Sequence, residues 1–209
     1  MSHVYSDTDG VFLVKLARQT VEDYVRLKKK VDVPADTPSH LRKESGVFVT
    51  LNATRGDSVT LRGCIGRPYP TQPLVEATID SAVDAASNDF RFSPVSVKEF
   101  NSILVELSIL TPPQKMKYSD STDLLDLVEI GRDGLIVSRG GRRGLLLPQV
   151  PVEWEWGVKE FLEQTCNKAG LPANMWLDPK TEFMSFQAEI FGEEKPRGNV
   201  VRNPQHPRV

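Results

Sequence analysis

Two neighbouring stretches that alternate apolar with polar residues constrain the fold of this chain more than any other feature. The first covers residues 46–51 (Gly-Val-Phe-Val-Thr-Leu) and the second covers residues 60–66 (Thr-Leu-Arg-Gly-Cys-Ile-Gly). A period of two is typical of β-strands that have one buried face. The connecting segment, residues 53–58, contains the Gly and Asp that short hairpin turns favour. The pattern therefore predicts a β-hairpin.

The register of this hairpin is constrained by its apolar side chains. We expect Leu61 to lie beside Val49 or Leu51, because a shift of one residue would turn the apolar set outward. The opposite face then carries polar residues from both strands, namely Thr50, Arg62 and Cys64. We therefore predict that the Arg62 and Cys64 side chains are neighbours in space.

The residues 61–66, Leu-Arg-Gly-Cys-Ile-Gly, resemble the signature hexapeptide of the AMMECR family, named for the Alport syndrome, midface hypoplasia and elliptocytosis chromosomal region. The similarity extends over roughly residues 10–192, through the segments 46–50, 91–94, 110–113 and 146–150. Where the family usually has Asp-Pro-Arg-Phe-Pro-Pro, this chain has Asp-Phe-Arg-Phe-Ser-Pro at 89–94. The resemblance implies a widespread intracellular protein to which no settled activity is attached.

Length and composition bound the domain organisation. The chain has 209 residues, of which 39% are hydrophobic and 26% charged, as is typical of a protein with an apolar core. The length fits one large domain or two small intimate ones. We predict a single AMMECR-like domain over residues 1–192, made of two intimate halves at about 10–113 and 114–192. Residues 193–209 are polar and contain proline, which predicts a loose C-terminal tail.

Charge and cysteine content argue against several classes of protein. The formal net charge of −2 disfavours a generally basic nucleic-acid surface, so we expect any nucleic-acid binding to be weak and unspecific. The two cysteines, Cys64 and Cys166, fit a reducing compartment rather than a disulfide scaffold. No apolar run approaches the roughly 18 residues of a membrane span, and the N-terminus is too polar for a signal peptide. We predict a cytoplasmic protein that does not bind membranes.

The same order of elements occurs twice along the chain. A helix at about 9–30 is followed by two copies of a hairpin, a proline-containing loop, an amphipathic helix and a strand. The helix and strand of the first copy are expected at 75–86 and 103–109; the hairpin, helix and strand of the second are expected at 133–147, 154–169 and 183–191. We predict an α+β fold with mainly antiparallel sheet and packed helices, and we interpret the repeated order as a structural duplication.

Cys64 and Arg62 are the candidate catalytic residues. A thiol becomes a useful nucleophile only as the thiolate, and a cation beside it favours that form. Arg62 on the same strand face could stabilise the Cys64 thiolate or bind an anionic substrate. The alternative is that Cys64 is a small core residue and that Arg62 anchors a carboxylate or a loop. A base for the thiol is not evident, because His40 belongs to no recognisable catalytic motif.

Three further residues are candidates for binding a substrate. Thr50 shares the predicted face with Cys64 and could add a hydrogen bond. Glu106 interrupts an apolar strand, where a carboxylate needs a partner or a raised pKa. It could meet Arg62 or Arg91, and a structural ion pair is the alternative role for it.

The remaining polar motifs are assigned to structure. The segment 139–143, Arg-Gly-Gly-Arg-Arg, could bind an anion, but solvated arginines on a hairpin turn explain it more simply. It lacks the ending of a phosphate-binding loop. Cys166 falls on the apolar face of a helix and is expected in the core. No metal-ligand spacing is present, and no cofactor is predicted.

We favour a thiol-based enzyme or a binder of a small anionic ligand, with its site on the hairpin strand 61–66. The alternative is a non-catalytic interaction module that binds a protein or RNA. A concave polar pocket at Arg62 and Cys64 would favour the first interpretation. A flat patch formed by Arg139, Arg142 and Arg143 would favour the second.

Overall fold

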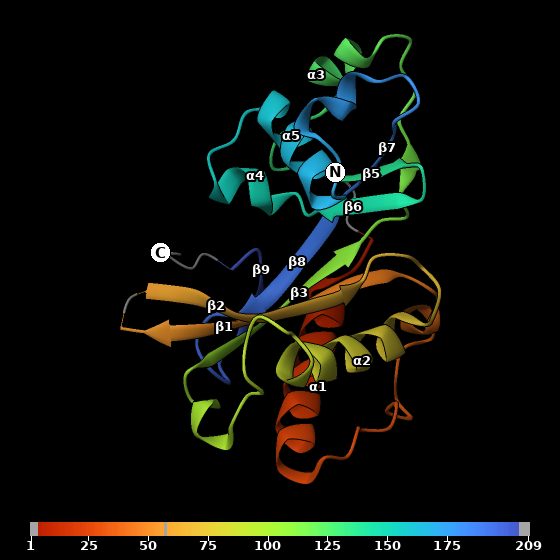
Figure 1. The fold of residues 1–209 in the computed structure, drawn as a ribbon. Helices are drawn as coiled ribbons and strands as arrows, with labels where there is room; N and C mark the ends of the chain where they lie inside the picture. Colours follow the sequence, from red (N-terminus) through yellow and green to blue (C-terminus); the bar gives the residue numbers. More distant parts are fainter. Residues whose placement is uncertain (1–3, 57, 205–209) are drawn as a thin grey trace. The chain divides into compact units, whose positions relative to one another are not determined.

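The computed structural model describes residues 4–56 and 58–204. The chain forms two compact units (Figure 1). Unit 1 contains the residues up to Leu110 and those from Glu189 onward, and unit 2 contains Thr111–Ala188. Helices and antiparallel strands build both units, so the predicted α+β class is confirmed. In the described part of the chain, no helix is both long and apolar enough to cross a membrane.

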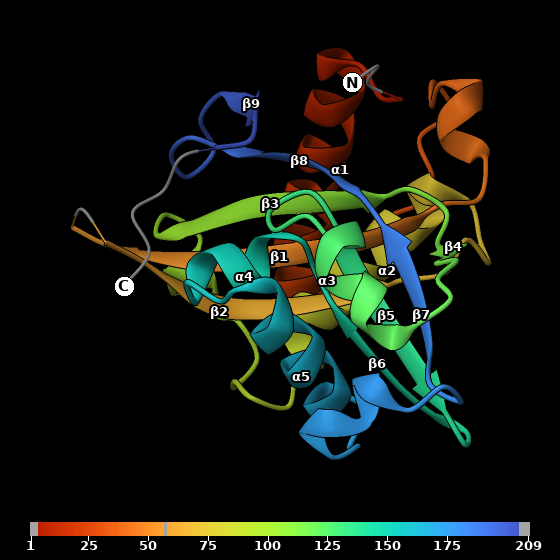
Figure 2. The ribbon, with the colours of Figure 1, turned by 90° about the horizontal axis from the view of Figure 1, so that it is seen from above.

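Unit 1 is a five-stranded sheet with two helices on one face. The strand order is β2-β1-β3-β8-β9, with β1 at Gly46–Arg55, β2 at Ser58–Arg67, β3 at Ile103–Leu110, β8 at Ala188–Glu193 and β9 at Val200–Arg202. The helices are α1 at Asp7–Leu27 and α2 at Leu74–Ser87, and the short 3-10 helices are Ser39–Arg42 and Val97–Glu99. Figures 1 and 2 show α1 and α2 on the same face of this sheet.

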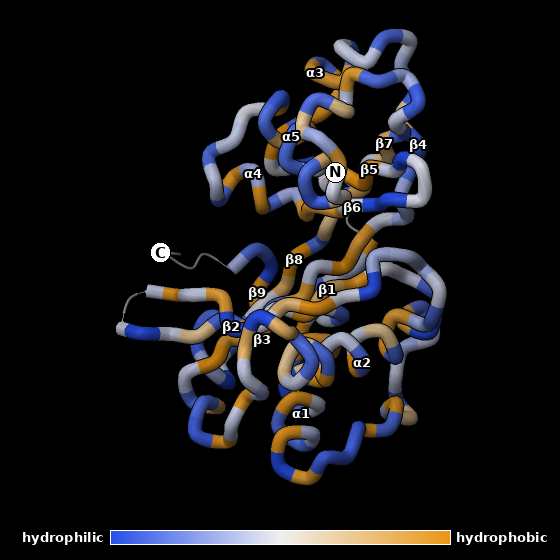
Figure 3. The backbone as a smooth tube through the Cα atoms, viewed as in Figure 1, coloured by the Kyte–Doolittle hydropathy of each residue, from blue (hydrophilic) through white to orange (hydrophobic). Residues whose placement is uncertain are grey.

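Helix α1 starts at a capping box. Ser6 and Asp9 each accept a hydrogen bond from the other's backbone N–H, which satisfies donors that the helix start leaves free. The helix ends at Lys28, whose φ of 55° is left-handed. The apolar face of α1 packs on the sheet, and Figure 3 shows apolar residues along β1 and β3. The prediction of a helix at about 9–30 is confirmed to within a few residues.

Strand β1 alternates as predicted, but β2 does not. Leu51 of β1 pairs with Gly63, and Asn52 pairs with Leu61, so Arg62 is an extra residue in a β-bulge. Gly63 therefore takes the place beside Leu51 where we expected Leu61, and Leu61 is 42% exposed. The predicted register was wrong because a bulge reverses the alternation on one side of it.

Gly63 faces α2 at a point of very close approach. A Cβ atom on this residue would lie 2.3 Å from the backbone oxygen of Ala85 near the end of α2. Any side chain here would push the helix from the strand. The glycine therefore permits the tight helix–sheet packing.

Unit 2 is a four-stranded sheet with helices packed on it. The strand order is β4-β7-β5-β6, with β4 at Gln114–Lys115, β5 at Gly134–Arg139, β6 at Arg142–Leu146 and β7 at Glu182–Phe186. The helices are α3 at Leu124–Leu127, α4 at Gln149–Glu153 and α5 at Val158–Lys168, with 3-10 helices at Ser121–Asp123 and Ala173–Leu177. Helix α5 begins later than predicted, and Trp154 lies outside it with 67% of its surface exposed.

The predicted strand at 183–191 is two strands that belong to different sheets. Strand β7 pairs with β4 and β5 of unit 2, and β8 pairs with β9 in the sheet of unit 1. The change of partner occurs at Gln187, whose backbone N–H donates to Thr111 Oγ1 at 2.8 Å. The predicted division at about 10–113 and 114–192 was therefore wrong at its C-terminal end, because the last strands return to unit 1.

The segment after Glu193 is ordered where the structure describes it. Strand β9 pairs with β8, and Arg202 forms an ion pair with Glu189 at 2.6 Å. Glu193 is itself buried, and it accepts a hydrogen bond from Arg18 Nε of α1 at 3.0 Å. The prediction of a loose tail was thus wrong for residues 193–204, and residues 205–209 lie outside the described residues.

Candidate functional site

The face of the unit 1 sheet opposite α1 and α2 carries a row of three polar side chains. Thr50 on β1 lies directly across from Cys64 on β2 and from Glu106 on β3. Residues paired in this way have Cβ atoms about 5 Å apart, so the three side chains adjoin. Thr50 is 6% exposed, Glu106 is 3% exposed and Cys64 is half-buried. We call Cys64, Thr50 and Glu106 the polar row.

Cys64 is held at both its side chain and its backbone. The Thr50 hydroxyl lies 3.3 Å from the Cys64 sulfur and donates a hydrogen bond to it. The backbone N–H of Cys64 donates to Asp89 Oδ2 at 2.9 Å, and its carbonyl accepts from Arg91 Nη2 at 3.2 Å. Because β2 is an edge strand, these backbone groups have no partner strand, and Asp89 and Arg91 take its place.

Asp89 and Arg91 form a two-point ion pair, which we call the clamp. Arg91 Nε lies 2.9 Å from Asp89 Oδ1, and Nη2 lies 2.7 Å from Oδ2. The hydrogen bonds from Arg91 lower the pKa of the Asp89 carboxyl to about 2, with the backbone N–H of Cys64 contributing. The clamp is therefore charged on both sides at neutral pH.

The Cys64 thiol does not rest as a thiolate. Burial raises its pKa above the ordinary value, and the charges of Asp89 and Glu106 act in the same direction. The Thr50 hydrogen bond and the Arg91 charge lower the pKa but do not offset burial. We expected the Arg62 charge to stabilise the Cys64 thiolate, and this expectation was wrong, because the cation that acts on the thiol is Arg91.

Arg62 is occupied elsewhere. Its Nε donates to Glu99 Oε1 at 2.6 Å, and its Nη2 donates to the carbonyl oxygen of Ser93 at 2.9 Å. Burial acts to raise the pKa of the Glu99 carboxyl, but hydrogen bonds from Arg62 and Ser96 outweigh it and hold the pKa low. Arg62 thus ties the bulge of β2 to the segment 93–99, as the anchoring alternative proposed.

Sequence reasoning missed Asn52, which follows Thr50 on the same face of β1. Asn52 is 2% exposed, and its Nδ2 has no hydrogen-bond partner among the described residues. A buried donor without a partner costs free energy and needs an explanation. The strict alternation of β1 was the available signal, since it places Asn52 two positions beyond Thr50.

Cys166 differs from Cys64 in its surroundings, which are apolar. It is 0% exposed in the core of unit 2, beside Phe161 and Leu162. Burial raises the pKa of its thiol to about 11. The prediction that Cys166 is a core residue is confirmed.

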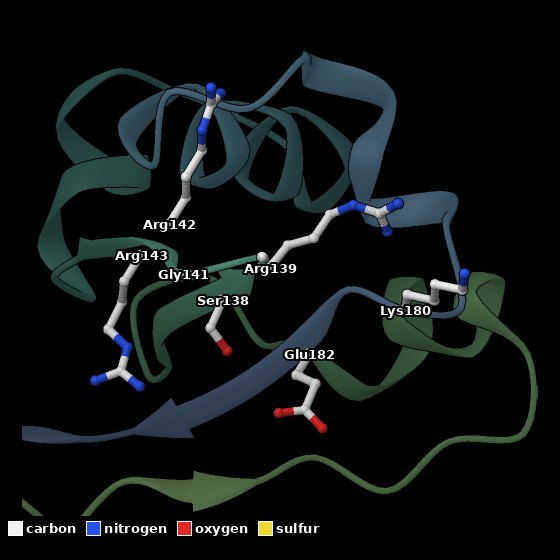
Figure 4. Close-up of a pocket in the computed structure, with 8 residues that line it drawn as sticks. Ser138, Arg139, Gly141, Arg142, Arg143, Lys180 and Glu182 are labelled. Carbon is white, nitrogen blue, oxygen red and sulfur yellow. The ribbon is translucent and has the colours of Figure 1, made fainter.

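Unit 2 has a pocket at the β5–β6 turn, shown in Figure 4. Its volume is about 420 Å³, and its lining consists of Ser138, Arg139, Gly140, Gly141, Arg142, Arg143, Lys180 and Glu182. The arginine-rich motif at 139–143 thus borders a concavity rather than a flat patch. Among the described residues, no group of three or more His, Cys, Asp or Glu side chains could hold a metal.

Comparisons with known proteins agree on one family. The AMMECR1 family model matches residues 14–191. A protein of Thermococcus gammatolerans is 53% identical over 199 residues, covering 95% of this chain and 97% of that protein. Protein TK0174 of Thermococcus kodakarensis is 52% identical over the same shares of both chains.

A solved structure supports the fold. The crystal structure of uncharacterized protein PH0010 from Pyrococcus horikoshii matches with a TM-score of 0.89 and 49% sequence identity. The match covers 94% of this chain and 97% of that one. The names of these related proteins carry no activity.

Proposed function

The chain belongs to the AMMECR1 family, and we propose that its polar row performs thiol-dependent chemistry on a small, uncharged carbonyl compound. Cys64 is the reacting group. The observation that carries the proposal is the alignment of a half-buried thiol, a hydroxyl and a buried carboxylate across three adjacent strands. Such a set can supply a nucleophile, a hydrogen bond and a proton acceptor.

The resting protein holds Cys64 as a neutral thiol, so the proton must leave as the ligand reacts. The sulfur forms a bond to the carbonyl carbon, and the electron pair of the C=O double bond moves to its oxygen. The S–H proton passes to the carboxylate of Glu106 by way of the Thr50 hydroxyl, which lies between them. The unpartnered amide of Asn52, on the same face, is suited to donate a hydrogen bond to the oxygen that gains charge.

The charges around Cys64 define the ligand class. The clamp places one positive and one negative charge beside the thiol, and Glu106 adds a second negative charge. Arg62, expected to receive an anionic substrate, is paired with Glu99. Two carboxylates act on Cys64, and Arg62 is not available to an anion, so this geometry favours the thiol interpretation over the anionic-ligand one. Arg62 and Arg91 act as positioning residues.

Two unpaired cysteines fit a compartment that keeps thiols reduced. We therefore propose a cytoplasmic location. In such a compartment Cys64 remains a free thiol, because disulfides do not form, and it can react with the carbonyl compound.

Alkylation of the native protein tests the proposal. Iodoacetamide is uncharged and iodoacetate is anionic, so the ratio of their rates reports the charge that surrounds a thiol. We expect Cys64 to react well before Cys166, and to prefer iodoacetamide over iodoacetate more strongly than glutathione does. Peptide mapping after timed alkylation of the native protein compares Cys64 with Cys166, and a Cys166→Ser background gives the Cys64 rate with each reagent.

Two variants sharpen this experiment. Glu106→Gln removes the carboxylate of the polar row and should lower the pKa of Cys64 and weaken the preference for iodoacetamide. Glu76→Gln makes the same charge change on the exposed side of α2 and should alter neither. If native Cys64 resists alkylation as fully as Cys166 does, the polar row is a structural anchor and the interaction-module alternative takes its place.

A further inference from the structure

We propose that the β5–β6 turn of unit 2 binds a small ligand that carries two or more phosphoryl groups. This inference is independent of the thiol chemistry proposed for unit 1. It rests on the pocket at the turn, on the charges that line it, and on the backbone of its two glycines. We call Arg139, Arg142, Arg143 and Lys180 the basic cluster.

The basic cluster supplies far more positive than negative charge to the pocket. The pocket lining contains these four basic residues and one acidic residue, Glu182. That carboxylate already pairs with Lys115, which lies outside the pocket lining. The volume of about 420 Å³ is within the range of small-ligand sites.

Two members of the cluster are not held in a close ion pair; the Lys180 charge acts on Asp178 only at longer range. Arg139 is partly neutralised, because its Nη1 pairs with Asp178 and also donates to Thr181 Oγ1 at 3.2 Å. Arg142, in contrast, donates to the neutral carbonyl of Gly170. Within the described residues, neither Arg142 nor Lys180 forms an ion pair with an acidic side chain. These two cations are the strongest candidates to meet an anion.

The backbone of the turn is open to a ligand. Gly140 and Gly141 have φ values of 53° and 80°, the left-handed conformations that a two-residue hairpin turn requires. A Cβ atom at either glycine would meet nothing within 4 Å. Bare amides in such a turn can donate to phosphoryl oxygens beside the guanidinium groups, which bind phosphate in two-point fashion.

The directions of the side chains determine how many anionic groups the ligand needs. Figure 4 shows Arg142 and Arg143 pointing to opposite sides of the hairpin, while Arg139 and Lys180 extend toward the same side. One phosphate could not contact all of them, but a chain of phosphoryl groups lying across the turn could. The lining contains no aromatic residue on which a nucleobase could stack. The phosphoryl groups themselves are therefore what the site recognises.

Calorimetric titration with inorganic triphosphate tests the inference. Orthophosphate and ATP are titrated in parallel at about 150 mM salt, where exposed charges are screened beyond about 8 Å. We expect triphosphate to bind about tenfold or more tightly than orthophosphate, since each additional charge-assisted contact is worth about 1.5 kcal/mol or more. Equal affinities for triphosphate and ATP would identify the phosphoryl chain alone as the ligand. A clearly tighter ATP would show that the nucleoside is also recognised and would overturn the conclusion that the phosphoryl groups alone are the ligand.

A matched pair of double variants controls for net charge. Arg142→Gln with Lys180→Gln should weaken triphosphate binding about tenfold or more. Lys15→Gln with Lys159→Gln removes the same charge at exposed positions away from the turn and should change affinity less than about twofold.

Arg142→Lys keeps the charge but not the two-point geometry of the guanidinium, so it should weaken triphosphate binding less than the Gln double variant does, and it remains a test even if Arg142→Gln proves too unstable to study. The inference is overturned if both double variants weaken binding equally. It is also overturned if triphosphate fails to bind, and binding of a single-stranded RNA dodecamer in that case would favour the interaction-module alternative.

Discussion

The hairpin of unit 1 and the hairpin of unit 2 share one framework and differ in the chemistry placed on it. In each unit, the first hairpin strand lies between the second hairpin strand and a later strand, in the orders β2-β1-β3 and β6-β5-β7. All of these pairings are antiparallel. In each unit a helix connects the hairpin to the later strand. The strand order, the antiparallel pairing and the connecting helix are thus common to both units, and they do not by themselves determine where a functional site lies.

The registers of the two units can be aligned residue by residue. Leu51 pairs with Gly63 in unit 1, and Val137 pairs with Gly144 in unit 2. One position along, Thr50 lies between Cys64 and Glu106. Its counterpart Ile136 lies between two apolar residues, Leu145 and Met184. The polar row of unit 1 thus corresponds to an apolar row in unit 2.

This correspondence separates the shared strand pairing from the side chains that differ between the units. We propose that the two units arose by duplication, since both strand order and register agree. The pairs that differ are then the ones that were specialised: a thiol and a carboxylate in unit 1, and a basic turn in unit 2. Arg62, the bulged residue, has no counterpart in the second hairpin.

The largest effect on stability is expected at the two glycines that occupy equivalent positions in the two units and face a helix, Gly63 and Gly144. A Cβ on Gly63 would lie 2.3 Å from Ala85 O, and one on Gly144 would lie 2.5 Å from Ala169 N. Gly63→Ala and Gly144→Ala should each lower the free energy of unfolding by about 1–3 kcal/mol, because backbone must move. Gly157→Ala, where a Cβ meets nothing within 4 Å, is the control.

Urea unfolding followed by circular dichroism measures these changes. The control should cost less than about 1 kcal/mol, since it loses only a favourable residue at a helix N-cap. If one glycine tolerates alanine and the other does not, the two helices do not approach their strands equivalently. The duplication would then lose its main structural support.

A smaller effect is expected at the clamp, which holds the edge strand of unit 1. The pKa of Asp89 is about 2, below its value in an unfolded chain. A lowered pKa stabilises the fold above the unfolded value near pH 4, and this contribution is lost as pH falls toward 2. We expect it to be about 2 kcal/mol, from a difference of nearly two pH units.

Unfolding titrations between pH 2 and pH 6 check this value. Asp89→Asn should lower stability at pH 6 and remove most of the slope between pH 4 and pH 2. Asp84→Asn is a suitable control, because Asp84 lies at the end of α2 and pairs with Arg67 rather than with the clamp. An unchanged slope in Asp89→Asn would mean that other carboxyls dominate acid unfolding.

The strands and helices were largely predictable from periodicity, and the site was predictable only in part. Alternation identified β1, and the polar face that carries Thr50 and Cys64 follows from it. The bulge at Arg62 could not be found this way, because Gly63 has no side chain to mark which face it occupies. The continuous alternation of residues 182–193 likewise conceals that β7 and β8 join different sheets.

Polar contacts between residues far apart in the sequence could not be predicted either. The clamp joins Cys64 to residues 25 and 27 positions away, and Arg62 meets Glu99 at a separation of 37. No local pattern specifies which carboxylate will pair with which arginine. The position of Asn52 follows from the alternation, but only the structure shows that its Nδ2 is buried and has no hydrogen-bond partner among the described residues.

The smallest expected effect separates the two arginines of unit 1. Arg91 is the cation that lowers the pKa of Cys64, whereas Arg62 donates its hydrogen bonds to Glu99 and to the carbonyl oxygen of Ser93. Arg91→Gln should therefore raise the pKa of the Cys64 thiol further, while Arg62→Gln should leave it in place. The pH dependence of iodoacetamide labelling from pH 7 to pH 11, in a Cys166→Ser background, measures both pKa values.

A shift of the Cys64 pKa in Arg62→Gln alone would mean that Arg62 lies beside the thiol, as the alternation suggested. The bulge geometry would then differ from the one described. A shift in Arg91→Gln alone would show that the clamp sets the reactivity of the thiol as well as its position. The apolar row of unit 2 offers no such control, since Leu145 stands where Cys64 does.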